Sequence, residues 1–356
     1  MSDSPIATSA LETELTRQLG IEVPLICGPM YPCSNPELVG AASAAGGMGV
    51  LQPISLTYVH GHDFRAGVRL IQQLAGGRPI GMNALIEKSS KTYFERMQRW
   101  IDIALEEGVR FFVTSLGNPR WVVEKVHAVG GFVYHDVTER KWALKGAEGG
   151  VDGLIAVNGR AGGHAGDRTP AELLDEIGDL GLPVVCAGGV GSEEDFVAAL
   201  RLGYAGVQMG TRFIATEECR AAAAYKQAII DAGEDDIVLS ERITGVPVAV
   251  INTPYIERMG LKAGPFARWM LRGRRRKHWM RTFYALKSVW QLKRASLDES
   301  ASREYWQAGK SAAGVHRIEP AGDIIRRFAA AAVEQAAVAT APAVGASEPA
   351  ASVARE

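Results

Sequence analysis

Short apolar runs alternate along most of the chain with segments in which apolar residues recur every three or four positions. The runs are VPLICGPM, GMGVLQ, RPIGMNAL, RFFVTS, GFVYHDV, VDGLIAVN, LPVVCAGGV and YAGVQMGTRF. Most of them are continuously apolar, which is typical of strands that are buried on both faces of a parallel sheet. The segments between them, such as KTYFERMQRWIDIALEEG, have the spacing of amphipathic helices.

Eight such units within about 210 residues predict an α/β fold, a (β/α)8 TIM barrel over residues 16–216. A doubly wound open sheet is the alternative. It is disfavoured because the first strand is not followed by the G-x-G-x-x-G turn of a dinucleotide-binding fold.

The rest of the chain has a different pattern. Residues 217–320 predict a smaller helical region, an insertion or substrate lid, and residues 321–336 predict a helix that packs on the barrel. We expect a flexible amino terminus over residues 1–15 and a disordered, alanine-rich tail over residues 337–356. The basic run from Arg272 to Lys277 predicts a solvated helix face, with a phosphate or membrane-surface contact as the alternative.

Composition narrows the classes of function. The 356 residues are 47% hydrophobic, which allows a sizeable core. Their formal net charge is -1, so the sequence lacks the positive field of a nucleic-acid-binding protein. The amino-terminal stretch lacks the basic start and apolar run of a signal peptide, and no stretch of about 18 apolar residues could span a bilayer. The four cysteines show no C-x-x-C pair. We therefore expect a cytoplasmic protein with a small-molecule partner and no stable membrane association, and both a monomer and a homodimer stay open.

Glycines follow the seventh and eighth predicted strands, where TIM barrels usually bind phosphate groups. They lie in the segments Ala187, Gly188, Gly189 and Met209, Gly210, Thr211. Backbone without side chains lets amide hydrogens approach phosphate oxygens, and we expect Arg212 to add a charge nearby.

Two other strand ends predict a surface for a flat ligand. Gly28, Pro29 and Met30 follow the first strand, and Asn83 lies at the end of the third, where its amide can both donate and accept. For Met30 alone, core packing is the competing interpretation. A phosphate site beside a flat surface favours FMN as the cofactor.

Several segments together resemble the nitronate monooxygenase family, whose members were formerly called 2-nitropropane dioxygenases. These are CGPMYPCSNPELVGAASAAGGMGVL, NGRAGGHAG, CAGGV, GVQMGTRF with the following ATEE, and YWQAGKSAAGV. They occur in the family's order and cover residues 20–330. The same set is similar to FMN-dependent enoyl-acyl-carrier-protein reductases and to some NADH:quinone reductases.

The resemblance implies roles for individual residues. Gly28, Pro29 and Met30 match the segment along the flavin ring, and Asn83 matches the asparagine near the ribityl chain. Gly188, Gly189, Gly210 and Thr211 match the phosphate cradle, which Gln208 immediately precedes. His164, after Ala161, Gly162 and Gly163, matches the histidine over the flavin and is the candidate catalytic residue. An imidazole can take the proton from a carbon next to a nitro group, or hold a nitronate anion when protonated.

The sequence departs from the family at two positions. Arg160 stands where many members have an acidic residue, and it is either an anion-recognition group or a member of a surface ion pair. At the end of the fifth strand, where many members carry a lysine, the chain has His135 and Asp136. We expect His135 to face the site, with Asp136 as its partner. Tyr305, Trp306 and Lys310 either cap the barrel mouth or pack the helical region onto it.

The remaining histidines and Cys27 do not predict chemistry. His60, His62, His127, His278 and His316 lack metal-ligand spacing, so no metal is expected, and Cys27 has no basic partner nearby in the sequence. We therefore expect an FMN-dependent enzyme that oxidises alkyl nitronates with O2 to a carbonyl compound and nitrite. The alternative is an NAD(P)H-dependent reductase acting on quinones or enoyl thioesters. A non-catalytic flavin-binding protein is the third hypothesis.

Overall fold

The eight predicted strands form a closed parallel barrel in the computed structural model, which describes residues 10–87, 91–242, 246–262, 293–298 and 305–340. Neighbouring strands pair in sequence order, and β1 closes the ring with β8. The strands are β1 (Leu25–Cys27), β2 (Met48–Leu51), β3 (Ile80–Leu85), β4 (Phe111–Ser115), β5 (Phe132–Val137), β6 (Gly153–Val157), β7 (Val184–Ala187) and β8 (Gly206–Met209). The TIM-barrel prediction is confirmed.

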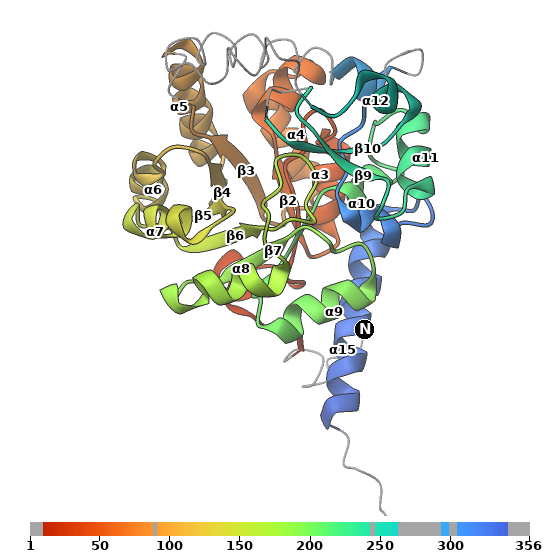
Figure 1. The fold of residues 1–356 in the computed structure, drawn as a ribbon. Helices are drawn as coiled ribbons and strands as arrows, with labels where there is room; N and C mark the ends of the chain where they lie inside the picture. Colours follow the sequence, from red (N-terminus) through yellow and green to blue (C-terminus); the bar gives the residue numbers. More distant parts are fainter. Residues whose placement is uncertain (1–9, 88–90, 243–245, 263–292, 299–304, 341–356) are drawn as a thin grey trace, which may run out of the picture.

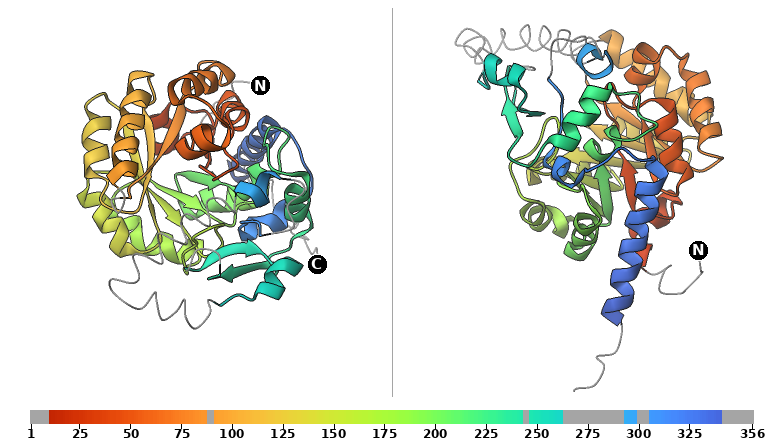
Figure 2. Two further views of the ribbon diagram at one scale, coloured as in Figure 1. Left: turned by 90° about the horizontal axis from the view of Figure 1, so that it is seen from above. Right: turned by 90° about the vertical axis from the view of Figure 1, so that its right-hand side faces the viewer.

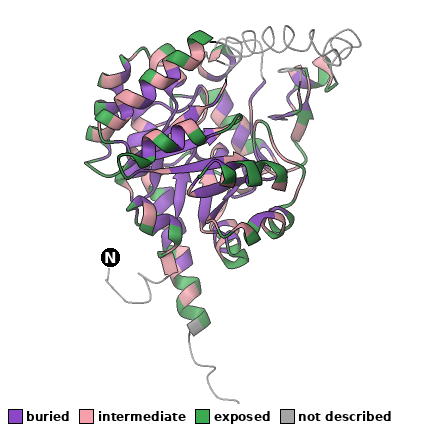
Figure 3. Ribbon diagram, turned by 90° about the vertical axis from the view of Figure 1, so that its left-hand side faces the viewer, coloured by how far each residue is buried: buried purple, intermediate pink, exposed green. Residues whose placement is uncertain are grey.

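Helices surround the barrel (Figures 1 and 2). They are α3 (Pro36–Ala44), α4 (Phe64–Leu74), α5 (Lys91–Glu106), α6 (Arg120–His127), α7 (Arg140–Glu148), α8 (Pro170–Ile177) and α9 (Glu193–Leu202), with short helical turns η1 (Ser55–Val59) and η2 (Gly178–Leu180). Burial is concentrated in the strands and on the helix faces turned toward them (Figure 3). This arrangement explains why the strand segments are continuously apolar, because one side of each strand faces the barrel interior and the other faces helices.

Alternate residues of most strands belong to two separate apolar clusters. The interior cluster includes Val50, Val113, Tyr134, Ile155 and Val185. Their neighbours along the strands pack against the helix layer instead. This alternation decides which polar side chains at the strand ends point into the barrel.

The amino-terminal segment closes the bottom of the barrel. Leu15, in α2 (Glu14–Leu19), is fully buried and belongs to the interior cluster. The hydroxyl of Tyr134 donates a 3.0 Å hydrogen bond to Oε1 of Gln18. We expected a flexible segment up to residue 15, and this expectation is wrong for residues 10–15. Apolar side chains there fill the base of the barrel. Residues 1–9 lie outside the described part of the chain.

After β8 the chain forms a second region and then returns to the barrel. This region contains α10 (Thr211–Ile214), α11 (Ala223–Asp231), α12 (Pro254–Met259) and η3 (Lys310–Gly314). It also contains an antiparallel hairpin of β9 (Ile237–Ser240) and β10 (Val248–Ile251), which the helical prediction missed. The run VAVI is four residues long and fully buried, too short for its periodicity to separate strand from helix.

The last helix, α15 (Ala321–Thr340), completes the helix layer. It packs against α9 and α3, the helices that follow the seventh and first strands, and extends beyond the barrel in Figure 1. Its buried positions include Ile324, Ile325, Phe328 and Ala332, which recur at helical spacing. The helix continues four residues beyond its predicted end at residue 336. Residues 341–356 and the basic run Arg272–Lys277 lie outside the described residues.

Candidate functional site

Three polar side chains point into the barrel near the carboxyl ends of their strands. Asn83, Asp136 and Gln208 each lie two residues after an interior position, at Gly81, Tyr134 and Gly206. Gln208 lies beside Gly28, where an added Cβ would come within 2.9 Å of the glutamine Cγ. The mouth of the barrel therefore brings together residues from four strands that are distant in the sequence.

Each of these side chains has a buried oxygen without a hydrogen-bond partner among the described residues. The atoms are Oδ1 of Asn83, Oδ1 of Asp136 and Oε1 of Gln208. A buried polar atom without a partner is costly, so such atoms usually meet a ligand or a water molecule. Their convergence on the barrel mouth fits a polar, planar ligand, and the sequence predicts such a ligand beside Asn83.

The loop after β7 forms a cradle of backbone groups. Gly188 and Gly189 have φ angles of 115° and 82°, a region that favours glycine. An added Cβ at Gly188 would lie 2.5 Å from the backbone nitrogen of Ala161. Within the described part of the chain, the backbone N–H groups of Gly189 and Gly210 donate no hydrogen bond. These free donors fit an anionic group such as the phosphate of FMN.

Asn158, at the end of β6, joins this cradle to the next loop. Its Nδ2 donates a 2.9 Å hydrogen bond to the carbonyl of Gly188, and its Oδ1 accepts one of 2.8 Å from the backbone of Arg160. Sequence reasoning missed Asn158, although it is the first residue of the NGRAGGHAG segment. Its contact with Arg160 is local, but its contact with Gly188, 30 positions away, is created only by the fold.

His164 lies in the loop between β6 and α8, after Gly162 and Gly163. The residue is exposed to solvent at the mouth of the barrel. Nearby protein atoms nevertheless desolvate the imidazole, and this lowers its pKa. The loop is attached to the second region, because the carbonyl of Gly163 accepts a 2.8 Å hydrogen bond from Ala249 in β10. A neutral imidazole at the mouth can accept a proton from a bound carbon acid.

His135 does not face the site, so this expectation is wrong. Its Nδ1 lies 2.8 Å from Oγ1 of Thr114, and an added Cβ at Gly146 in α7 would lie 3.3 Å from its ring. Burial lowers the pKa of His135 to about 4. Because strand residues alternate, Asp136 is the member of this pair that points into the barrel, and no hydrogen bond between the two is present among the described contacts.

Arg160 forms an ion pair with Glu234 of the second region. Its Nη2 contacts Oε1 of Glu234, and its Nη1 donates a 3.1 Å hydrogen bond to Oε2. The side chains are 34% and 41% exposed. This geometry favours the ion-pair interpretation of Arg160 over anion recognition, because the fork of the guanidinium already meets a carboxylate.

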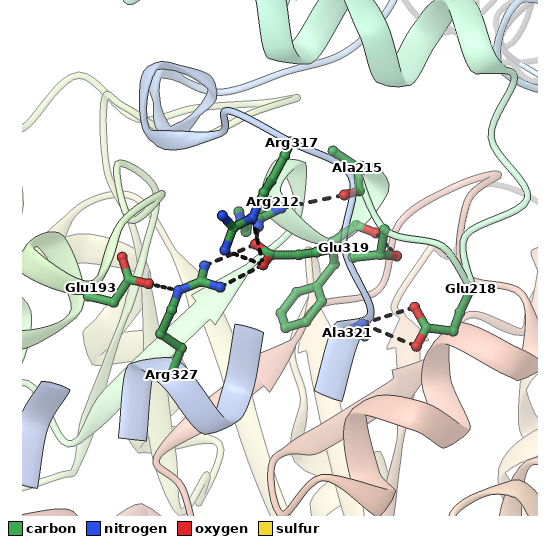
Figure 4. A network of polar contacts seen from close by, with 10 residues as sticks. Glu193, Arg212, Ala215, Glu218, Arg317, Glu319, Ala321 and Arg327 are labelled. Atoms are coloured by element: carbon green, nitrogen blue, oxygen red, sulfur yellow. Dashed lines mark hydrogen bonds and ion pairs between the residues drawn. The ribbon is translucent and has the colours of Figure 1, made fainter. Parts of the chain in front are cut away.

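Arg212 also forms an ion pair, so the expectation that it adds a charge beside the phosphate is wrong. It is buried and forms an ion pair with Glu319, which Arg317 and Arg327 also contact (Figure 4). Arg327 contacts Glu193 as well. The network joins the end of β8 to α15 and so fixes the chain around Thr211.

The segment from Tyr305 to Gly314 returns across the loops of the mouth. Its backbone makes the contacts: Lys310 N–H donates to the carbonyl of Arg160 at 2.9 Å, and Gly309 closely approaches Gly162. The aromatic side chains pack into the second region. Trp306 stacks on Tyr225 with ring centroids 5.6 Å apart and donates from Nε1 to the carbonyl of Ala295.

Tyr305 is likewise buried, and its ring stacks against that of Tyr255 with centroids 6.2 Å apart. These contacts favour packing roles for Tyr305 and Trp306 rather than substrate contact.

Across the described residues, no group of His, Cys, Asp and Glu side chains is arranged to hold a metal ion, and no helix is long and apolar enough to cross a membrane.

Comparison with known proteins identifies the family. The family model described as nitronate monooxygenase matches residues 12–330. The chain is 31% identical over 252 residues to the (3aS,4S,5R,7aS)-5-hydroxy-7a-methyl-1-oxo-octahydro-1H-indene-4-carboxyl-CoA dehydrogenase of Rhodococcus jostii (strain RHA1), covering 70% of this chain and 69% of the relative. It is 30% identical to a probable nitronate monooxygenase of Staphylococcus saprophyticus, covering 70% and 81% of the two chains. The structure of FabK from Thermotoga maritima superposes with a TM-score of 0.74 at 27% identity, covering 92% and 98%. The chain therefore belongs to the nitronate monooxygenase family of flavin-dependent oxidoreductases.

Proposed function

We propose that this protein binds FMN and uses it to oxidise alkyl nitronates with O2, giving a carbonyl compound and nitrite. The observation that carries the proposal is the set of unpartnered polar atoms at the carboxyl end of the barrel, the end at which the loop after β6 carries His164. Asn83 and Gln208 supply two of these atoms, and the glycine cradle after β7 lies at the same mouth. Family membership supports the reaction class.

The residues present fit FMN. Gly189 and Gly210 offer backbone donors to its phosphate, and Thr211 keeps a hydroxyl there. Asn83 and Gln208 offer side-chain amides to its polar atoms, and the missing Cβ of Gly28 leaves room for the side chain of Gln208. When bound, FMN supplies the electron transfer between the organic substrate and O2.

The protein's own part of the reaction concerns binding and protons. With its pKa lowered, His164 is neutral at pH 7, so its free ring nitrogen can accept the proton on the carbon next to a nitro group. For a substrate that is already a nitronate, its N–H can donate to a nitro-group oxygen. The glycines and alanines around it leave room for the substrate.

The first experiment is anaerobic mixing of the purified holoprotein with a primary alkyl nitronate and, separately, with NADH and NADPH. We expect the nitronate to change the flavin absorbance within the turnover time and both nicotinamides to leave it unchanged. On admission of O2, oxygen consumption and nitrite release should follow. Rapid bleaching by a nicotinamide with an inert nitronate would instead establish the NAD(P)H-dependent reductase.

Oxidation of an acyl-CoA thioester is a second candidate. It is favoured by the 31% identity to a dehydrogenase whose name specifies a carboxyl-CoA substrate. The same anaerobic experiment with a panel of CoA thioesters tests it. Bleaching by a thioester, without nitrite chemistry, would replace the nitronate proposal.

A further inference from the structure

Asp136 is a buried carboxyl group directed into the barrel mouth. It follows Tyr134 by two residues in β5, and Tyr134 belongs to the interior cluster. Some surface of the residue remains accessible, but its Oδ1 is covered and has no hydrogen-bond partner among the described residues. It shares this property with Asn83 and Gln208 on the same interior surface.

Among the described residues, no charged side chain compensates this carboxyl group. Burial raises the pKa of Asp136 to about 7, and it is the only cause of the shift. The preceding His135 faces helix α7, and Asn83 and Gln208 are neutral. His164, the titratable group in the loop above, is neutral near pH 7. Within the described ranges, the barrel mouth therefore places no cation beside Asp136.

We propose that Asp136 is a further cofactor-contacting residue, which stays protonated in the holoprotein and donates its O–H to an acceptor atom of the flavin ring system. This proposal rests on the flavin site proposed above, but not on the identity of the substrate. The polar edge of a flavin carries acceptor oxygens and nitrogens, which a carboxylic acid can meet and a carboxylate would repel. A carboxylic acid kept neutral by an apolar site is a known hydrogen-bond donor in enzyme active sites.

The proposal has a consequence for binding. If only the protonated form of Asp136 accepts the cofactor, FMN affinity falls as pH rises, by about tenfold per unit above the pKa of this group. Replacement by asparagine keeps size and a hydrogen-bond donor but removes the ionisation. The Asp136→Asn variant should therefore bind FMN with an affinity that is nearly constant across the same range.

The experiment measures the dissociation constant of FMN for refolded or flavin-stripped full-length protein by quenching of flavin fluorescence. Wild type, Asp136→Asn and Asp175→Asn are compared between about pH 7 and about pH 9, above the second pKa of a phosphate monoester near 6. Asp175, exposed on the outer helix α8, is the matched control. We expect wild type and Asp175→Asn to weaken together and Asp136→Asn to stay level.

Two results would overturn the proposal. Parallel pH dependence in all three proteins would show that Asp136 does not govern binding. Tighter binding by wild type at higher pH, with weak binding by Asp136→Asn throughout, would mean that an ionised carboxylate accepts from the flavin. Neither result bears on nitronate turnover, which is measured separately by nitrite release.

A measurement on the wild type alone guards against a variant that fails to fold. The infrared difference spectrum between FMN-bound and FMN-free protein near pH 7 should contain a shifted carbonyl band of a protonated carboxyl group. Absence of such a band, with only carboxylate bands changing, would refute a protonated Asp136.

Discussion

The backbone N–H of Gly309 donates a 3.0 Å hydrogen bond to Oγ1 of Thr211, although the two residues are 98 positions apart. Thr211 follows β8, and Gly309 belongs to the segment that returns across the mouth. The bond is buried. It anchors the returning segment on the chain after β8 that we propose as part of the phosphate cradle.

Gly309→Ala should weaken this junction. The backbone at Gly309 has φ of -99°, so alanine can adopt it, but the added Cβ would lie 2.6 Å from the nitrogen of Gly162. Such overpacking against backbone costs about 1–3 kcal/mol. We expect a lower denaturant midpoint and a lower flavin content. Gly178→Ala is the control, because the nearest atom to its Cβ would be 3.9 Å away; an equal loss in that variant would contradict the steric argument.

His164→Ala should abolish turnover while the protein keeps its flavin. Loss of a general base lowers kcat by about 10²- to 10⁴-fold. Flavin absorbance measures retention, and nitrite release with a nitroalkane substrate measures turnover. His127→Ala, an exposed histidine paired with Asp152, should remain active. Full activity of His164→Ala would remove the imidazole from the mechanism.

The pH profile of the same reaction follows from the lowered pKa of His164. The base is the neutral imidazole, which is present above its pKa. With a neutral nitroalkane, kcat/KM should therefore stay level near pH 7 and decrease only below the ordinary histidine value of about 6.5. A midpoint above that value would contradict a base with a lowered pKa in the free enzyme.

His135 should make the protein less stable in acid. Its folded pKa of about 4 is below the unfolded value, so protonation favours the unfolded chain as pH falls from about 6.5 toward 4. The loss reaches about 3 kcal/mol at most. His135→Gln keeps a partner for Thr114 and should lose less stability over this range. Urea unfolding of both proteins at several pH values measures the difference, and identical slopes would contradict the assignment.

Glu319→Gln should destabilise the junction of β8 and α15 strongly. It would leave Arg212, Arg317 and Arg327 facing one another without their shared carboxylate (Figure 4). Removing one member of a buried ion pair costs about 3–5 kcal/mol. Thermal unfolding measures the effect, with Glu12→Gln at an exposed pair with Arg17 as the control. A loss no larger than that of the control would show that the network carries little stability.

The sequence by itself determined the barrel, because the apolar runs and helical segments that build it are local patterns and parallel strands then pair in chain order. It also located the glycine segments after β7 and β8, since their place at strand ends follows from chain order. Only the tertiary structure decided which of His135 and Asp136 enters the barrel: the run GFVYHDV is too continuously apolar to reveal its two faces. The tertiary structure also decided the partners of Arg160 and Arg212. These are Glu234 and Glu319, which lie 74 and 107 positions away in the chain. A charged side chain is satisfied by whatever the fold brings within a few ångströms, and that proximity is not a property of neighbouring residues in the chain.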